Sequence, residues 1–238
     1  MINPICISTG LVYRLTNDRN EMVERLRQFS PDGIEISFAD PQFLFDFTPT
    51  RSNLEYLRTT RTSIHAPWKH IIYGNNDLCR IFLGELQKLS NLVDAKNVTF
   101  HKSPEDNFSV LADYSFPCSV ENDDYKFVGK APTSPEEVRA VLSQYPRMGF
   151  TFDFPHALTV DPGSIPEFLR FPEISQIHLS YLSRELPDHY FLYKNDSPRL
   201  RALIRQIPPN IPIVLECVSP NEQEVELAKR EVEYLRSI

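Results

Sequence analysis

Glycine is scarce in this chain, and it is missing from a place where one common fold needs it. The 238 residues include seven glycines, and no Gly-x-Gly-x-x-Gly turn follows an early strand-like segment. An open, doubly wound α/β sheet usually carries that turn, because its backbone must approach a bound phosphate closely. The missing turn therefore disfavours this class of nucleotide-binding sheet.

Cysteine pairs and long apolar runs are also lacking. The four cysteines are widely spaced and form no Cys-x-x-Cys motif, so a cysteine-ligated zinc site is not expected. Three of them fall in apolar, strand-like segments, which favours reduced thiols and a cytoplasmic location. No apolar run approaches the roughly 20 residues of a membrane-spanning helix, and the N-terminal segment does not resemble a signal peptide.

Positive charge is in deficit as well. The chain has 25 Lys and Arg against 32 Asp and Glu, for a formal net charge of -7. A protein that grips nucleic acid neutralises phosphates with Lys and Arg, so this balance disfavours a nucleic-acid partner. Hydrophobic residues make up 41% and charged residues 24%, which are ordinary values for a folded domain.

Segments rich in β-branched and aromatic residues recur along the chain, each bounded by turn-forming residues. They predict eight strands: Ile5–Ser8, Gly33–Ser37, Thr62–Ala66, Asn97–His101, Cys118–Glu121, Gly149–Asp153, Ser175–Ser180 and Ile211–Glu216. Helical patterns between them predict helices over Asp18–Phe29, Arg51–Arg58, Asp77–Val93, Ser134–Gln144, Ile165–Arg170, Ser197–Gln206 and Ser219–Tyr234, with a turn or two at Phe108–Tyr114. Ser-Pro pairs open two of these helices, because Ser caps and Pro fits the first turn.

Eight strands alternating with helices imply a parallel sheet, and eight strands close a (β/α)8 TIM barrel of about 250 residues. We therefore expect an α/β protein in which residues 1–238 form a single barrel domain. Because side chains alternate across a strand, one register places a bulky apolar set against the outer helices. That set is Ile34, Ile36, Ile64, Val98, Phe100, Val120, Phe150, Phe152, Ile177, Leu179, Ile213 and Leu215.

The alternate positions, which would face the barrel interior, are mostly polar. Those at or near the C-terminal strand ends are His65, His101, Glu121, Asp153, His178 and Glu216. Active sites of such barrels lie at that end, and buried like charges are costly without a cation. Carboxylates and imidazoles suit Zn²⁺, Mn²⁺ or Co²⁺, and carboxylates also accept Mg²⁺. A further interior acid, Glu35, is expected to form a structural pair.

Short fragments in this order resemble the xylose isomerase-like TIM barrel superfamily, which includes sugar isomerases, ketose 3-epimerases and endonuclease IV. The fragments are Gly33-Ile34-Glu35, Ser63-Ile64-His65-Ala66-Pro67, the strand ending at His101, Val120-Glu121-Asn122, Phe152-Asp153-Phe154-Pro155-His156-Ala157, Ile177-His178-Leu179-Ser180 and Leu215-Glu216. The resemblance covers nearly the whole chain.

The resemblance implies roles for individual residues. The shared metal ligands would be Glu121, Asp153, His178 and Glu216, with Glu121 and Glu216 also acting as the catalytic acid–base pair. Four histidines would contact the substrate, or additional metals in the nuclease type: His65, His101, His156 and His189. The nuclease type also has an Asp where this chain has Pro187, so that Asp188 would have to substitute. The isomerase type commonly has an Arg after the seventh strand, for which Arg184 is the candidate.

The first functional hypothesis is a divalent-metal-dependent sugar or sugar-phosphate isomerase or epimerase, working by proton transfer through a metal-stabilised enediolate. Its partner would be a small carbohydrate, and homo-oligomerisation stays open. One alternative is an endonuclease IV-like phosphodiesterase that uses two or three zinc ions. The other is a degenerate, non-catalytic barrel. Metal stoichiometry separates them, because one exchangeable ion favours isomerisation and several zinc ions favour hydrolysis.

Overall fold

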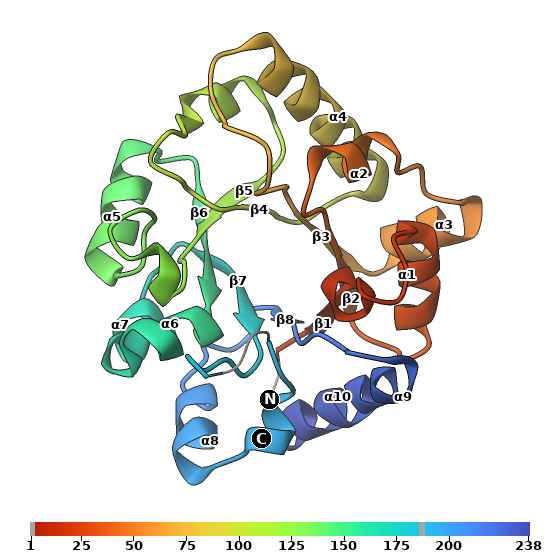
Figure 1. Ribbon diagram of the computed structural model, residues 1–238, viewed down its shortest axis with the longest axis vertical. Coiled ribbons are helices and arrows are strands. Elements are labelled where there is room, and N and C mark those ends of the chain that lie inside the picture. Colours follow the sequence, from red (N-terminus) through yellow and green to blue (C-terminus); the bar gives the residue numbers. More distant parts are fainter. Residues whose placement is uncertain (1–2, 186–188) are drawn as a thin grey trace.

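Eight parallel strands close on themselves in the computed structural model, which describes residues 3–185 and 189–238 (Figure 1). The strands pair in sequence order, and the last pairs with the first to complete the ring. They are β1 (Ile5–Ser8), β2 (Gly33–Ser37), β3 (Arg61–His65), β4 (Val98–Phe100), β5 (Cys118–Glu121), β6 (Gly149–Asp153), β7 (Ile174–Leu179) and β8 (Ile213–Leu215). The predicted (β/α)8 fold is confirmed, and every predicted strand end lies within two residues of the observed one.

Helices surround the barrel, and most of them match the prediction. They are α1 (Arg19–Arg27), α2 (Pro41–Phe45), α3 (Arg51–Thr59), α4 (Asp77–Val93), α5 (Pro135–Gln144), α6 (Phe154–Val160), α7 (Ile165–Phe168), α8 (Pro198–Ile204), α9 (Glu222–Val225) and α10 (Leu227–Ser237). Ser134 caps α5 as expected, in a capping box with Glu137. Within residues 3–185 and 189–238, no helix is both long and apolar enough to cross a bilayer.

Three helical predictions were incomplete or wrong. Helices α2 and α6 were missed because each is short, although each follows an Asp cap with a Pro in its first turn. The last helix does not begin at Ser219-Pro220, because the Ser219 hydroxyl donates to the Asn221 carbonyl at 2.9 Å. Asn221 instead caps α9, and the helical segment is divided into α9 and α10.

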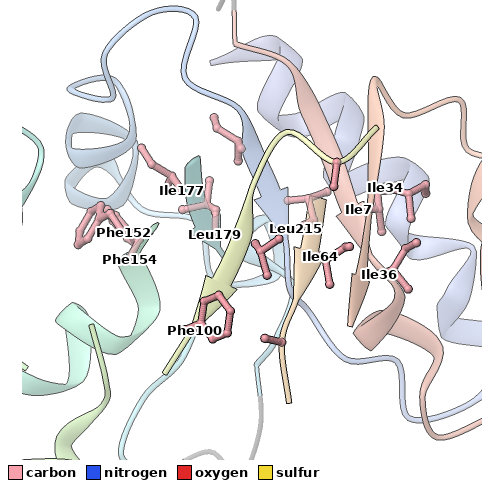
Figure 2. Close-up of a cluster of buried hydrophobic side chains, with 14 of the residues drawn as sticks. Ile7, Ile34, Ile36, Ile64, Phe100, Phe152, Phe154, Ile177, Leu179 and Leu215 are labelled. Carbon is pink, nitrogen blue, oxygen red and sulfur yellow. The ribbon is translucent and has the colours of Figure 1, made fainter. Parts of the chain in front are cut away.

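The apolar side chains on the outer face of the barrel form the main core (Figure 2). All twelve residues predicted to point outward are completely buried against the surrounding helices. Burying a Val, Leu, Ile or Phe side chain stabilises a fold by about 1.5–3 kcal/mol. This layer therefore supplies most of the hydrophobic stabilisation and leaves the barrel interior free for polar residues.

The barrel interior is filled by polar side chains that bond to one another. The Thr151 hydroxyl lies 2.5 Å from that of Ser119 and 3.0 Å from that of Thr99, and the Asn97 amide donates to Ser119 at 2.8 Å. The Gln176 amide donates to Thr99 at 3.0 Å. Because buried polar groups are stable only when paired, this network forms a rigid floor beneath the C-terminal mouth.

One glycine supports this geometry by its small size. A Cβ atom on Gly33 would lie 1.9 Å from the Arg61 carbonyl oxygen of the neighbouring strand and 2.8 Å from the Cys6 sulfur. In contrast, a Cβ on Gly84, in helix α4, meets no atom within 4 Å. Gly33→Ala should therefore destabilise the protein by about 1–3 kcal/mol or more.

The matched variant Gly84→Ala should instead stabilise the protein by about 0.8–1 kcal/mol, because alanine favours a helix interior. Urea unfolding of both variants and the wild type measures the two opposite changes. An unchanged midpoint for Gly33→Ala would show that β2 and β3 do not approach so closely.

Candidate metal centre

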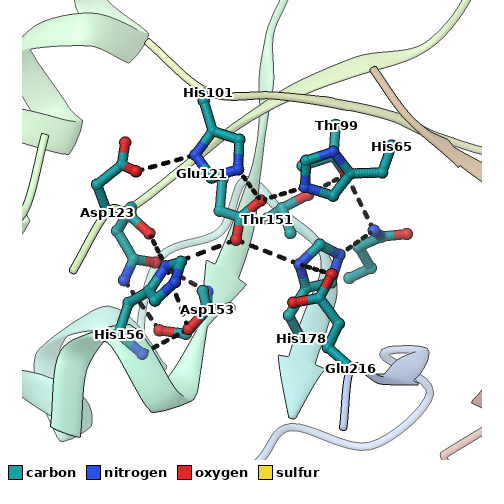
Figure 3. A network of polar contacts seen from close by, with 12 residues as sticks. His65, Thr99, His101, Glu121, Asp123, Thr151, Asp153, His156, His178 and Glu216 are labelled. Atoms are coloured by element: carbon teal, nitrogen blue, oxygen red, sulfur yellow. Dashed lines mark hydrogen bonds and ion pairs between the residues drawn. The ribbon is translucent and has the colours of Figure 1, made fainter. Parts of the chain in front are cut away.

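Four side chains from four strands meet at the C-terminal mouth of the barrel (Figure 3). They come from the end of β5, the end of β6, the next-to-last position of β7 and the residue after β8: Glu121, Asp153, His178 and Glu216. One ligand atom from each lies within 4.8 Å of the others. Parallel strands of a closed barrel end at one rim, so residues far apart in sequence become neighbours there.

Asp153 has a carboxylate oxygen with no bonding partner. Its Oδ1 caps α6 by accepting the His156 backbone N–H at 2.5 Å. Its backbone N–H donates to the Asn122 side-chain oxygen, and its backbone carbonyl accepts from the Asn122 side-chain nitrogen. Its Oδ2 is buried and has no hydrogen-bond partner. An unpaired buried anionic oxygen is costly, so the atom fits a bound cation.

His178 is held in one orientation by a second acid. Its Nε2 lies 3.1 Å from Glu35 Oε2, and its Nδ1 lies 3.3 Å from both Glu121 Oε1 and Glu216 Oε1. Glu35 also accepts the Gln176 amide at 2.7 Å, which joins it to the interior network. A carboxylate behind the outer nitrogen is the usual support of a metal-binding histidine. Glu35 thus forms the expected structural pair, and its partner is His178.

The carboxylates and the His178 imidazole of this cluster shift one another's pKa values. Burial raises the pKa of Asp153 well above its ordinary value, and the Glu121 and Glu216 carboxylates raise it further. Burial also acts to raise the pKa of Glu216, but the nearby His178 outweighs burial and lowers that pKa to about 2. Burial lowers the pKa of His178, yet the carboxylates of Glu216, Glu35 and Glu121 outweigh it and raise that pKa well above the ordinary value. Protons on Asp153 and His178 therefore balance the charge, and a divalent cation would replace them.

A second ligand set shares Glu121 with the first. His65 and His101 lie close to it, and one ligand atom from each of the three is within 4.8 Å of the others. His65 Nδ1 lies 3.1 Å from the Ala66 carbonyl oxygen, and His101 Nδ1 lies 2.9 Å from the Asp123 carboxylate. The Nε2 atoms face Glu121 Oε2, at 3.1 Å from His65 and 3.6 Å from His101. Both rings thus present Nε2, the atom a metal would take, to the same side of Glu121.

A third overlapping set joins His65 to His178 and Glu216. The remaining two predicted histidines lie beside the centre and belong to none of these sets. His156 Nδ1 is 2.9 Å from the Asn122 carbonyl, and His189 Nδ1 is 2.8 Å from the Ser180 hydroxyl. Their rings meet edge to face at 5.4 Å. Pro187 and Asp188, named for a third metal, lie outside the described residues. Among the described residues, these two histidines belong to no cluster of three or more ligand groups.

A cavity of about 830 Å³ opens over these ligand sets. The predicted residues His65, His101, Glu121, His156, His189 and Glu216 line its inner end. Its outer end is lined by Trp68, Lys69, Lys102, Ser103, Pro104, Glu105, Asp123, Phe127, Lys130 and Ala131. The volume lies in the range of small-molecule sites, so ligands of that size can reach the predicted metal and substrate residues.

Two features of the site could not be read from the sequence alone. Asp123 supports His101 across two neighbouring strands, and only its position two residues after Glu121 hinted at a role. Arg184 does not point into the cavity: it donates to the Thr159 carbonyl at 2.9 Å and lies over the Tyr125 ring. The suggestion that Arg184 serves as the isomerase arginine is therefore not supported.

Comparison with known proteins shows the fold. No protein-family model matches the chain, and no curated protein matches it. Among solved structures, endonuclease IV from Thermus thermophilus is 15% identical, with 98% of both chains covered and a TM-score of 0.65. The probable 3-DHS dehydratase AsbF from Bacillus anthracis is 11% identical, with 98% of both chains covered and a TM-score of 0.72. D-Allulose 3-epimerase from Methylomonas sp. is 11% identical, with 99% of this chain and 96% of that chain covered and a TM-score of 0.68.

The effect of Asp153→Asn on the free energy of unfolding, relative to the wild type, should depend on whether metal is present. In metal-stripped protein the variant should be at least as stable as the wild type, because it removes one of three clustered carboxylates yet keeps the oxygen that caps α6. Added Mn²⁺ or Zn²⁺ should stabilise the wild type by about 2.7 kcal/mol at 100 times the dissociation constant. The variant should lose most of that gain.

Thermal unfolding with and without metal measures both changes. Asp18→Asn is the matched control, because Asp18 also caps a helix but lies outside the site. It should keep the full metal-dependent gain. Equal metal responses in the wild type and Asp153→Asn would remove Asp153 from the ligand set.

Proposed function

From the xylose isomerase-like TIM barrel fold and its overlapping ligand sets, we propose that the protein is a metal-dependent hydrolase of phosphate esters. One observation carries the proposal: the two oxygens of Glu121 face different imidazoles. Oε2 faces His65 and His101, whereas Oε1 faces His178. A carboxylate placed in this way suits two divalent cations side by side, with Glu121 shared between them.

The chemistry of such a pair matches phosphoryl groups. Bound at these residues, two divalent cations would activate a water molecule and stabilise the charge on the attacking and leaving oxygens of an in-line displacement. The ligand types, imidazole and carboxylate, suit zinc or manganese. The endonuclease IV structure from Thermus thermophilus shares this fold, and its name is that of a nucleic-acid hydrolase.

The chain's own residues supply orientation and proton control. Glu35 and Asp123 hold the outer nitrogens of His178 and His101, so these rings cannot turn away from the centre. Burial, aided by His156, lowers the pKa of His189 to about 4, so its imidazole is neutral near pH 7. Its Nδ1 lies 2.8 Å from the Ser180 hydroxyl, which leaves Nε2 as the ring nitrogen open to a substrate or to water.

The second candidate is the isomerase or epimerase of a sugar or sugar phosphate. Glu216 favours it: this carboxylate is the least buried of the four ligands, lines the cavity and stays ionised with a pKa of about 2. D-Allulose 3-epimerase, one of the structural neighbours, shares the fold. The candidate ranks second because both oxygens of Glu121, its other acid–base residue, are engaged by imidazoles.

Zinc stoichiometry should separate the two candidates. We expect about two zinc ions per chain in the wild type, because the ligand set with Asp153 and the set with His101 share only Glu121. His101→Ala removes a ligand of one set only and should lower the content to about one. Glu121→Gln weakens both sets and should reduce hydrolysis of bis(4-nitrophenyl) phosphate by at least roughly 100-fold, since even outer supporting residues cost 10–100-fold.

Elemental analysis and hydrolysis assays on the same samples test this expectation. His70→Ala is the control, because His70 is exposed and paired with Asp40 outside the cavity. It should keep the zinc content and the rate of the wild type. One ion per chain, no hydrolysis and metal-dependent exchange of the carbon-bound hydrogen of a ketose would favour the isomerase. No metal uptake at all would favour a non-catalytic barrel.

A further inference from the structure

Unpaired lysines are concentrated at one place in this acidic protein. The chain has eight lysines and a net charge of -7. Four of them form salt bridges: Lys88, Lys96, Lys126 and Lys194. The other four have no salt bridge to any described residue, and three of these line the outer end of the cavity: Lys69, Lys102 and Lys130. Two carboxylates, Glu105 and Asp123, line the same part of the cavity, and Asp123 is paired with His101, so the three lysines give this part an excess of positive charge.

The three lysines come from three consecutive loops at the barrel mouth. Lys69 follows β3, Lys102 follows β4 and Lys130 lies in the loop after β5. Their loops are anchored by backbone hydrogen bonds, Lys69 to the Ala39 carbonyl at 3.0 Å and Lys130 to the Phe127 carbonyl at 2.8 Å. The backbone positions of Lys69 and Lys130 are therefore fixed by the fold.

Lys102 is the most confined of the three. Its ammonium donates to the Ser103 carbonyl at 2.5 Å, and burial lowers its pKa although Asp106 and Glu105 oppose this shift. The Asp106 carboxylate is itself occupied, because it accepts the backbone N–H groups of Tyr73 and Ser103, each at 2.7 Å. Lys102 thus keeps donors available for a ligand.

Two exposed aromatic side chains line the cavity together with the lysines. Trp68 is 41% exposed and Phe127 is 46% exposed, and both line the cavity. The Trp68 ring lies edge-on to His65 at 4.8 Å and is 5.6 Å from the His101 ring, so it borders the second ligand set directly. Apolar walls of this kind favour an uncharged middle part of a ligand.

We propose that Lys69, Lys102 and Lys130 form a subsite for an anionic group of the substrate, distinct from the group held at the metal centre. The substrate is then a small molecule with two anionic groups, one at each end of the cavity, and a compact uncharged part between Trp68 and Phe127. The identity of the reacting group rests on the proposed function, whereas the binding of an anion by the lysines does not.

The size and charge of the site favour a small molecule over a nucleic-acid strand. The cavity of about 830 Å³ falls within the 300–1,000 Å³ of small-molecule pockets. Binding to nucleic acid relies on many cations spread along the backbone path. Here, several arginines are engaged in ion pairs, among them Arg25, Arg51, Arg80, Arg139 and Arg201.

The chain carries its own reporter for this subsite, because Trp68 is its single tryptophan. Metal-stripped protein titrated with inorganic pyrophosphate at low ionic strength should show a saturable change in tryptophan fluorescence. The double variant Lys102→Ala, Lys130→Ala should weaken binding at least tenfold, with calorimetry as an independent readout and circular dichroism as the check of folding. Added salt should weaken binding to the wild type more than to the variant.

Lys229→Ala is the matched control, because Lys229 is also without a salt bridge to any described residue but lies in α10, away from the cavity. It should bind pyrophosphate like the wild type. No saturable binding to the wild type, or an equal loss in Lys229→Ala, overturns the subsite. Stronger binding of a single-stranded oligonucleotide than of pyrophosphate, compared at equal phosphate concentration, overturns the small-molecule assignment.

A matched pair of esters extends the test to the substrate class. For the zinc-loaded enzyme, kcat/KM should be at least tenfold higher with 4-carboxyphenyl phosphate than with phenyl phosphate, and the double variant should bring this ratio near one. If neither ester nor bis(4-nitrophenyl) phosphate is hydrolysed while pyrophosphate still binds the metal-stripped protein, the proposed function fails and the subsite stands. If both esters are hydrolysed at equal rates, the two-anion substrate class fails instead.

Discussion

Repulsion among buried carboxylates is the constraint on which the mouth of this barrel depends. Glu121, Asp153 and Glu216 are brought together by strands that cannot move apart without opening the barrel. Little water reaches the first two, so their charges must be balanced by protons, imidazoles or cations. The imidazoles around Glu121 and the unpaired oxygen of Asp153 both follow from this requirement. A divalent cation balances the same charge without placing protons on the acids.

The polar barrel interior supports this arrangement from below. An apolar filling would stabilise the barrel as well, and here the outer layer of Ile and Phe side chains already provides the main hydrophobic core. The interior network instead holds Glu35 in place through Gln176, and Glu35 in turn holds His178. One oxygen of Glu35, Oε1, has no hydrogen-bond partner, but its Oε2 is bonded, and the network resists displacement because each lost bond would leave a further unsatisfied group. The orientation of the His178 ring is thus set by side chains of the barrel interior, which lie beneath the metal centre.

The fold alone leaves the reaction open. An endonuclease, a probable dehydratase and an epimerase all share it with this chain at 15% identity or less. What differs among such barrels is the set of side chains at the strand ends and in the loops beyond them. In this chain His65 and His101 form a further ligand set with Glu121, and three lysines line the cavity. The proposal of hydrolysis ahead of isomerisation rests on these groups.

The amino-acid sequence by itself determined the barrel, the strand positions and the inward register, because alternation and strand spacing are local properties of the chain. The same register placed His65, His101, Glu121, Asp153, His178 and Glu216 at one rim, and the family resemblance singled out Glu121, Asp153, His178 and Glu216 as the predicted metal ligands. Tertiary structure alone decided which atoms face each other: that Glu35 supports His178, that Asp123 supports His101 and that Arg184 points away. Those contacts join side chains from different strands and loops, and their distances depend on barrel closure and loop paths that no local pattern encodes.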